Sequence, residues 1–590
     1  MLSFPYRRAR SFAAALALPL LGLVLTQIAP AADNAPAPRA AGTTLKALTA
    51  DELDAALISE VKGKSELMKN LEYLSDTIGP RLTGSKQLER ANEWTAAKMK
   101  EYGLENVKLE PWEIPIGWER GPAYMTVVEP ETKVHFPVAA VGWTPGTNGK
   151  VTGEVVLLRL RNKDDFEKYK GKLKNAIVIT SPPANVAPIT DLRYGPLPPA
   201  PRKKDEPKKD EPKKEEAKAK AADSVSADVE QPAKEQPKKE GTKELQPKKD
   251  DDAKQPEPKK VDPPGPGISP LIPFREVEEF LKAEGVACRI SDGGKPHGLL
   301  VAFGQWRPGD RATQAQIPHA VLAHEHYAML YRLASRPAPA VTKVEVRIES
   351  KFIPGPITVF NTVGEVKGSE KPDEFVVVGA HLDSWELGTG TMDNGTGSCV
   401  VLETARTVAA LAKAGYRPKR TIRFCLFTGE EQGLYGSREY VKKHQEEMEK
   451  TSLALIHDTG TGKVTGFATM NHPKAKEVLD PELKTLESMP DWAGLDVGFL
   501  LGSDHQSFGS SGVPGFACRQ DIDEYRLTHH TQTDTFDHAK APFLIQGAQV
   551  MSVTAVRAAN LPELLPRTAI RKKKDPEPKK EEKKDDKKKD

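Results

Sequence analysis

Short runs of consecutive apolar residues alternate with segments of helical period in the second half of the chain. The apolar runs at 375–380, 421–427, 452–457 and 513–518 have the length of strands, and 397–414 and 435–444 carry apolar residues at helical spacing. Strands without polar alternation are typical of sheets that are covered on both faces, and such sheets are largely parallel. The pattern predicts an α/β domain with a mostly parallel central sheet flanked by helices.

The first half of the chain predicts further elements of both kinds. Residues 65–114 predict two amphipathic helices around the turn GPRLTGS, followed by a strand. EVVLLRL, NAIVIT and HGLLVAF predict strands, and PFREVEEFLKAEG predicts a helix that ends at Gly285. We expect a small α/β lobe at 136–340, inserted into a discontinuous larger domain formed by 45–135 and 341–566.

Two segments are rich in Lys, Glu, Asp and Pro. Residues 201–266 contain almost no aromatic side chains, so we expect a disordered insertion in a surface loop of the small lobe. Residues 567–590 predict a disordered charged tail. Both segments interleave acidic with basic residues, and the whole chain has a formal net charge of only +3. This distribution argues against a nucleic-acid partner.

The N-terminus has the pattern of a secretory signal. Basic Arg7, Arg8 and Arg10 precede an apolar stretch at 12–28, and Ala29 and Ala31 form an A-x-A cleavage pattern. The stretch is short for a membrane anchor, and no later stretch is apolar enough to cross a bilayer. We predict a cleaved signal peptide at 1–31 and an exported protein that is periplasmic, cell-surface or secreted, without stable membrane insertion.

The four cysteines show no CxxC spacing. They stand at 288, 399, 425 and 518. This spacing suggests neither a disulfide framework nor a thiolate metal site. Buried free thiols, with at most one disulfide bridge among them, are the favoured interpretation.

Candidate chemistry is concentrated where the predicted strands end. His381 and Asp383 follow the run at 375–380, Glu430 and Glu431 follow 421–427, and Asp458 follows 452–457. Ligands of open α/β sheets bind beyond the carboxyl ends of the strands. The sequence therefore predicts that these side chains converge at one edge of the sheet.

Further acidic and imidazole groups come from two later stretches. TMDNGTG supplies Asp393, and RLTHHTQTDTFDH supplies His529, His530 and Asp534. Carboxylates crowded together repel one another unless cations neutralise them. Imidazole and carboxylate ligands without thiolates favour Zn²⁺, with Mn²⁺ or Co²⁺ as alternatives. The set suffices for two ions if one carboxylate bridges them, and Asp393 on its Gly-rich bend fits that role.

Two spacings suggest roles beside the metals. Glu430 and Glu431 are adjacent and point apart, so one can bind metal while the other acts as a general base. Asp383 lies two residues from His381, and on an extended backbone both side chains face the same way. Asp383 is therefore predicted to orient the His381 imidazole.

These motifs resemble a known family. GAHLDSWELGTGTMDNGTG, RPKRTIRFCLFTGEEQGLYGS, GVPG and HHTQTDT are similar to the co-catalytic dizinc exopeptidases of the aminopeptidase Y superfamily, most of all to its plasma glutamate carboxypeptidase (carboxypeptidase Q) subfamily. The resemblance extends over about 65–566, apart from the low-complexity insertion. It implies a zinc-exopeptidase fold of the phosphorylase/hydrolase type, a protease-associated-like lobe at 136–340, and a homodimer.

The resemblance also implies individual roles. One Zn²⁺ is bound by His381 and Asp458, the other by Glu431 and His530, and Asp393 bridges the two. Glu430 is the general base and Asp383 orients His381. The peptide bond between Asp393 and Asn394 is expected to be cis.

The predicted function is that of an exported dizinc metallo-exopeptidase. It would hydrolyse dipeptides or short peptides through a metal-bound hydroxide, with Glu430 as the base. His505 and Gln506 differ from the carboxypeptidase pattern and resemble aminopeptidase members, so aminopeptidase specificity is an alternative. A one-zinc acyltransferase of the glutaminyl cyclase type and a non-catalytic binding protein are further alternatives. The candidate substrate contacts are Asp504, His505, Tyr525 and His529.

Overall fold

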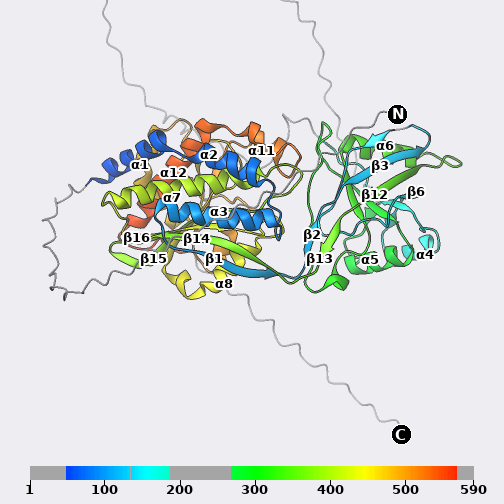
Figure 1. Ribbon diagram of the computed structural model, residues 1–590, viewed down its shortest axis with the longest axis horizontal. Coiled ribbons are helices and arrows are strands. Elements are labelled where there is room, and N and C mark those ends of the chain that lie inside the picture. Colours follow the sequence, from blue (N-terminus) through cyan, green and yellow to red (C-terminus); the bar gives the residue numbers. More distant parts are fainter. Residues whose placement is uncertain (1–47, 133, 187–266, 568–590) are drawn as a thin grey trace, which may run out of the picture. The chain divides into compact units, whose positions relative to one another are not determined.

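The computed structural model describes residues 48–132, 134–186 and 267–567, which form two eight-stranded sheets and their flanking helices (Figure 1). The predicted signal peptide, the low-complexity insertion at 201–266 and all of the charged tail except Arg567 lie outside the described residues. Within the described ranges, no helix combines the length and the apolar character that crossing a bilayer requires.

The first sheet is centred on four parallel strands. Its order is β1 (Glu105–Ile114), β14 (Ile357–Val366), β16 (Arg420–Phe427), β15 (Lys371–His381), β17 (Thr451–Ile456), β20 (Gly515–Gln520), β18 (Val464–Ala468) and β19 (Leu495–Asp496). Strands β16, β15, β17 and β20 run parallel, whereas β1, β14 and β18 pair antiparallel with their inner neighbours. The predicted α/β domain with a mostly parallel centre is confirmed.

Helices cover both faces of this sheet (Figure 1). Val376 and Val378 of β15 pack against a face covered by α1 (Ala50–Lys64), α2 (Leu67–Glu72), α3 (Lys86–Tyr102), α7 (Thr396–Lys413) and α12 (Ala541–Asn560). Val377 points to the other face, where α8 (Tyr435–Lys443) and α10 (His505–Gly509) pack. Two-sided burial explains why these strands are apolar at every position.

The second sheet builds a separate layer, which we call the smaller lobe (residues 117–186 and 267–353). Its order is β4 (His135–Phe136), β3 (Ala123–Glu129), β12 (Lys343–Ile348), β6 (Val151–Leu157), β8 (Ile177–Ile179), β10 (Cys288–Asp292), β11 (His319–Leu322) and β5 (Val138–Ala140). Helices α5 (Phe274–Ala283) and α6 (His324–Ala334) belong to it. The short elements α4 (Asp165–Tyr169), β7 (Arg159–Leu160) and β9 (Gly267–Ile268) also lie in this lobe, whereas α9 (Pro473–Leu479) and α11 (Asp523–Thr528) belong to the larger domain.

The prediction of a strand at HGLLVAF is wrong. Residues 297–303 join neither sheet; Val301 forms only an isolated antiparallel bridge with Thr531. The backbone N–H of Ala302 donates to the carbonyl oxygen of His530 at 2.7 Å. The segment stays outside the sheet because its backbone groups are bonded to a distant loop.

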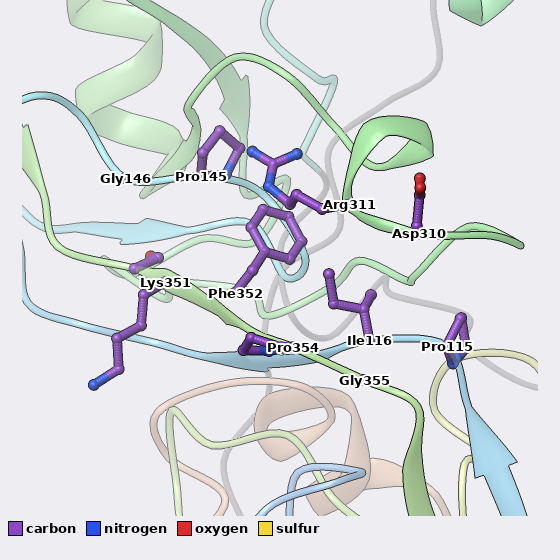
Figure 2. A pocket seen from close by; sticks show the side chains of 11 residues that line it. Pro115, Ile116, Pro145, Gly146, Asp310, Arg311, Lys351, Phe352, Pro354 and Gly355 are labelled. Carbon is purple, nitrogen blue, oxygen red and sulfur yellow. The ribbon is translucent and has the colours of Figure 1, made fainter.

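The chain passes between the two sheets twice, through β2 (Gly117–Glu119) and β13 (Lys351–Ile353), which pair antiparallel. A cavity of about 570 Å³ lies beside these crossings. Arg311 and Phe352 line it (Figure 2), and the guanidinium carbon of Arg311 lies 4.1 Å from the centre of the Phe352 ring. A Cβ atom on Gly355 would lie 2.2 Å from the carbonyl oxygen of Pro115. Only glycine therefore allows the returning strand to pass so close to the outgoing one.

The four cysteines are all buried and unpaired. Cys288 lies on β10 of the smaller lobe, whereas Cys399, Cys425 and Cys518 lie in the larger domain, on α7, β16 and β20. This agrees with the expectation of buried free thiols.

Candidate metal centre

The carboxyl ends of three parallel strands carry the predicted ligands to one place. His381 is the last residue of β15, Glu430 and Glu431 follow β16, and Asp458 follows β17. Asp393, which lies before α7, reaches the same cavity of about 370 Å³, which Glu430, Glu431 and Asp458 also line. The convergence expected from the strand ends is therefore present.

One group of potential ligands is built around His381. Its Nε2 atom lies 3.3 Å from Asp458 Oδ1 and 3.3 Å from Asp393 Oδ1. The three ligand atoms all lie within 4.8 Å of one another. One imidazole and two carboxylates at this separation form a suitable site for a divalent cation.

A second group is built around His530. Its Nε2 atom lies 2.8 Å from Glu431 Oε2 and 3.3 Å from Asp393 Oδ2. Asp393 therefore presents one oxygen to each group. His529 stacks on His530 with ring centroids 3.7 Å apart, and its Nε2 lies 3.9 Å from Asp393 Oδ2.

The chemistry of the donors fits two cations. Asp393 Oδ2 and Glu431 Oε1 are buried and have no hydrogen-bond partner in the structure. Buried carboxylate oxygens are normally bonded, so both atoms are available to a cation. The donors are imidazole nitrogens and carboxylate oxygens without a thiolate, a set that suits zinc.

Burial and crowding oppose ionisation of the two neighbouring glutamates. The pKa of Glu430 is raised well above its ordinary value by burial, which the nearby His381 only partly offsets. The pKa of Glu431 is raised by burial and by the charge of Asp393. Burial also opposes protonation of His381, but the surrounding carboxylates, Asp458 first, outweigh it and raise the pKa of the imidazole. Bound cations would favour the ionised carboxylates and the neutral imidazole.

Asp383 contacts both His381 and the two adjacent glutamates of this site. The Nδ1–H of His381 donates to the main-chain carbonyl oxygen of Asp383 at 2.9 Å, which leaves Nε2 directed at the ligand group. The carboxylate Oδ1 of Asp383 is farther from Nδ1, at 3.7 Å. That carboxylate instead accepts the backbone N–H groups of Glu430 and Glu431, each at 3.3 Å, and the Thr83 hydroxyl at 3.0 Å. The main-chain carbonyl of Asp383 therefore makes the shorter contact to the imidazole and its carboxylate the longer one.

A tight turn holds Asp393 between the two groups. Asp534 accepts the backbone N–H of Met392 at 2.5 Å and that of Asp393 at 3.3 Å. The Tyr525 hydroxyl donates to Asp393 Oδ1 at 2.9 Å. Gly390 has φ +67°, and a Cβ atom there would lie 2.2 Å from Ser384 Oγ, so the bend requires glycine. The Asp393–Asn394 peptide bond is cis, as expected.

Arg81 is a supporting residue that the sequence did not reveal. Its guanidinium is fully buried and donates to the carbonyl oxygens of Leu382 at 2.7 Å, Thr389 at 3.1 Å and Gly390 at 2.6 Å. It therefore ties the end of β15 to the bend that carries Asp393. The signal was the arginine in GPRLTGS, which the sequence pattern marks only as a turn.

The four predicted substrate contacts separate into two pairs. Tyr525 and His529 line the cavity. Asp504 and His505 are buried and are not among the residues that line it. Burial raises the pKa of Asp504 to about 7, and His505 Nε2 donates to the Leu500 carbonyl oxygen at 2.6 Å. Both carboxylate oxygens of Asp504 are buried without a hydrogen-bond partner, and the two residues stay predicted substrate contacts.

Gln432 lines the cavity and was not predicted. Its side chain is 2% exposed, and neither amide atom has a hydrogen-bond partner in the structure. Its place directly after Glu430 and Glu431 was the available signal. A buried amide without partners at a cavity wall is suited to bind substrate.

Comparison with known proteins shows which family model and which relatives the chain matches. Residues 361–555 match the model of peptidase family M28. The chain is 27% identical to carboxypeptidase Q of Mus musculus over 522 residues and 28% identical to carboxypeptidase Q of Bos taurus over 515 residues. Each of these alignments covers 86% of this chain and 88% of the relative.

Solved structures share the fold. A peptidase M28 precursor from Shewanella amazonensis SB2B superposes with a TM-score of 0.62 at 24% identity, covering 88% of this chain and 99% of that chain. The zinc aminopeptidase BSAP from Bacillus subtilis gives a TM-score of 0.50 at 18% identity, covering 83% of this chain and 93% of that chain. The match at 361–555, relatives aligned over 86% of the chain and this arrangement of ligands identify the chain as a metallopeptidase with a peptidase family M28 domain.

Proposed function

We propose that the chain is an exported dizinc exopeptidase that hydrolyses the peptide bond of dipeptides or short peptides. The observation that carries this proposal is the position of Asp393, which directs one oxygen to His381 Nε2 and the other to His530 Nε2, each at 3.3 Å. A single carboxylate shared by two imidazole groups is what a two-metal hydrolytic site requires. The names of the relatives, carboxypeptidase Q and zinc aminopeptidase, support the same function.

The ligands divide into two sets. His381 and Asp458 would hold one Zn²⁺, Glu431 and His530 the other, and Asp393 would contact both. Zinc is favoured over Mn²⁺ or Co²⁺ because imidazoles contribute to both sets and the Bacillus subtilis relative is a zinc enzyme.

Bound there, the two ions would lower the pKa of the attacking water and polarise the scissile carbonyl. Glu430 belongs to neither set and lines the cavity, so its carboxylate is placed to take the proton of the water and return it to the leaving amine. Asp383 holds the backbone of this glutamate in place. Gln432 offers an amide donor and acceptor to the peptide backbone of the substrate.

The first experiment combines metal analysis with substrate profiling. We expect about two zinc ions per chain and hydrolysis of dipeptides from a library that includes blocked N- and C-termini. Loss of activity on blocking the C-terminus indicates a carboxypeptidase or dipeptidase, whereas loss on blocking the N-terminus indicates an aminopeptidase. A fully zinc-loaded protein that cleaves no peptide in the library would refute the proposed activity.

Two further expectations concern the protein as a whole. The N-terminal pattern supports export with cleavage near Ala31, which N-terminal sequencing of secreted material checks. The family resemblance supports a homodimer, which light scattering of the mature protein checks.

A further inference from the structure

A segment of the smaller lobe contacts the loop that carries the ligand His530. The ammonium of Lys295 donates to the carbonyl oxygen of His529 at 2.6 Å. The N–H of Ala302 donates to the carbonyl oxygen of His530 at 2.7 Å, and Val301 bridges to Thr531. Each residue from His529 to Thr531 is therefore contacted from the same segment.

The contacts continue one residue farther. The side-chain oxygen of Gln532 accepts the N–H of Leu300 at 2.8 Å, and its amide nitrogen donates to the carbonyl oxygen of Gly298 at 3.2 Å. We call residues 295–302 the clasp. It bonds the backbone or side chain of four consecutive residues around one metal ligand.

His530 needs such support. Its φ angle is +60°, in the left-handed region that residues other than glycine adopt at a cost. Its imidazole must nevertheless stay 2.8 Å from Glu431 and 3.3 Å from Asp393. Since the local backbone does not favour this geometry, contacts from outside the loop must fix it.

We propose that the clasp couples docking of the smaller lobe onto residues 529–532 to occupancy of the metal site that His530 completes. The inference rests on the proposed two-metal function, because it takes His530 as a ligand. Coupling of this kind is reciprocal. Metal bound at the His530 site should stabilise docking of the clasp, and undocking of the clasp should lower the affinity of that site for metal by the same factor.

Lys295 is a positioning residue, since it bonds to the His529 carbonyl and contacts no ligand atom. Its buried ammonium also lies close enough to Asp393 and His530 to interact with their charges, so Lys295→Met removes a positive charge from the site as well as a bond. Gln532→Leu, which keeps this charge, isolates the positioning effect.

The first arm of the test measures zinc affinity by competition with a chelator. Lys295→Met should leave the zinc affinity of the site of His381 and Asp458 unchanged. It should lower the zinc affinity of the His530 site by about 10- to 100-fold, as loss of a group that supports a ligand does. Lys295→Arg should restore most of the affinity. Lys282→Met is the matched control, because Lys282 lies in the same lobe and bonds only to Gln316, at 3.1 Å.

A second variant separates positioning from folding. Gln532→Leu removes the bonds to Leu300 and Gly298 without changing Lys295. It should also lower the zinc affinity of the His530 site. The metal-free forms of both variants should keep the far-UV circular dichroism spectrum of the wild type and a single cooperative unfolding transition. Wild-type zinc affinity in both variants would overturn the proposal.

The reciprocal arm uses hydrogen exchange of the clasp amides. Zinc should slow exchange at Leu300 and Ala302 in the wild type, and this protection should vanish in His530→Ala. Protection that does not depend on zinc would overturn the coupling. His530→Ala should also lose one of two zinc ions, and retention of both ions would refute the assignment of His530 as a ligand. If His530→Ala loses one ion but Lys295→Met keeps the wild-type zinc affinity, only the proposed role of the clasp is refuted.

Discussion

The carboxylate of Asp383 accepts the backbone N–H of Glu430, with 3.3 Å between Oδ1 and N. Its second oxygen accepts the N–H of the adjacent Glu431 at the same distance. One buried carboxylate therefore fixes the turn that carries both the proposed base and a proposed ligand.

Replacing this carboxylate should disturb both neighbours. Asp383→Asn keeps the volume but turns one acceptor into a donor, which opposes one of the two backbone N–H groups. We expect kcat to fall by about 10- to 100-fold, together with weaker metal retention. Asp373→Asn, at an exposed position of the same strand, is the control and should change neither quantity.

Glu430→Gln should separate chemistry from metal binding. The variant keeps the shape of the side chain but cannot accept the proton of the attacking water. We expect full zinc content and turnover lower by about 10²- to 10⁴-fold. Glu439→Gln on α8, where the carboxylate is exposed and paired with Lys442, should behave as the wild type. Turnover near the wild-type value would exclude Glu430 as the base.

The shared position of Asp393 predicts an unequal loss of metal. Asp458→Ala removes a donor from one ligand group only and should lower zinc content by about one ion per chain. Asp393→Ala removes a donor from both groups and should lower the content towards zero. Metal analysis after dialysis checks this, and equal losses in the two variants would contradict a shared carboxylate.

Arg81→Met should destabilise the protein strongly. The substitution leaves the carbonyl oxygens of Leu382 and Thr389 without their donor, whereas that of Gly390 keeps the N–H of Gly395. At roughly 1–3 kcal/mol for each unsatisfied group, we expect the free energy of unfolding to fall by at least about 2 kcal/mol. Urea unfolding of the metal-free protein measures this loss. Arg90→Met, at an exposed position on α3, should shift it by no more than about 0.5 kcal/mol.

A charge network away from the metal centre predicts a pH dependence of stability. His444 Nε2 lies 3.0 Å from Glu110 and its Nδ1 lies 2.7 Å from Glu447. Burial opposes ionisation of Glu110, but the hydrogen bonds and charges of His444 and Lys108 together outweigh it and lower the pKa to about 2. The pKa of Glu447 is lowered to about 2, mainly by His444, and that of His444 is raised because its bonds to the two glutamates outweigh burial.

The sign of each contribution follows from these directions. The glutamates stabilise the fold fully above their ordinary pKa of 4.5, and this part is lost as the pH falls towards about 2. Protonated His444 contributes fully below its ordinary pKa of 6.5, and this part is lost as the pH rises through the raised folded value. Glu110→Gln should therefore cost most stability between pH 4.5 and 6.5 and least near pH 2, whereas Glu113→Gln, exposed on the same strand, should show no such profile.

The features that were predicted from the sequence are the buried strands and the residues at their ends, which depend on neighbouring residues. The apolar run at 375–380 became part of β15, and reading only the strand ends identified His381, Glu430, Glu431 and Asp458. These predictions succeeded because a strand buried on both faces leaves a local signature, and because parallel strands end at one edge of a sheet.

The failures concern interactions between distant segments. HGLLVAF has the composition of a strand, but its bonding partner is a loop more than 200 residues later. Arg81 reads as part of a turn because its acceptors lie 301–309 positions away. The Asp383 carboxylate was predicted to contact His381, but the shorter contact of the imidazole is to the main-chain carbonyl of Asp383, and the carboxylate accepts N–H groups 47 and 48 positions later. None of these partners is visible in a local pattern.

The four buried thiols allow unfolding to be followed without an added probe. Burial raises the pKa of Cys288, Cys399, Cys425 and Cys518, so each reacts slowly with a thiol reagent while its surroundings stay closed. Cys288 reports on the smaller lobe, and the other three report on the larger domain. Mass spectrometry of partly labelled protein would then reveal whether the two regions open together or one before the other.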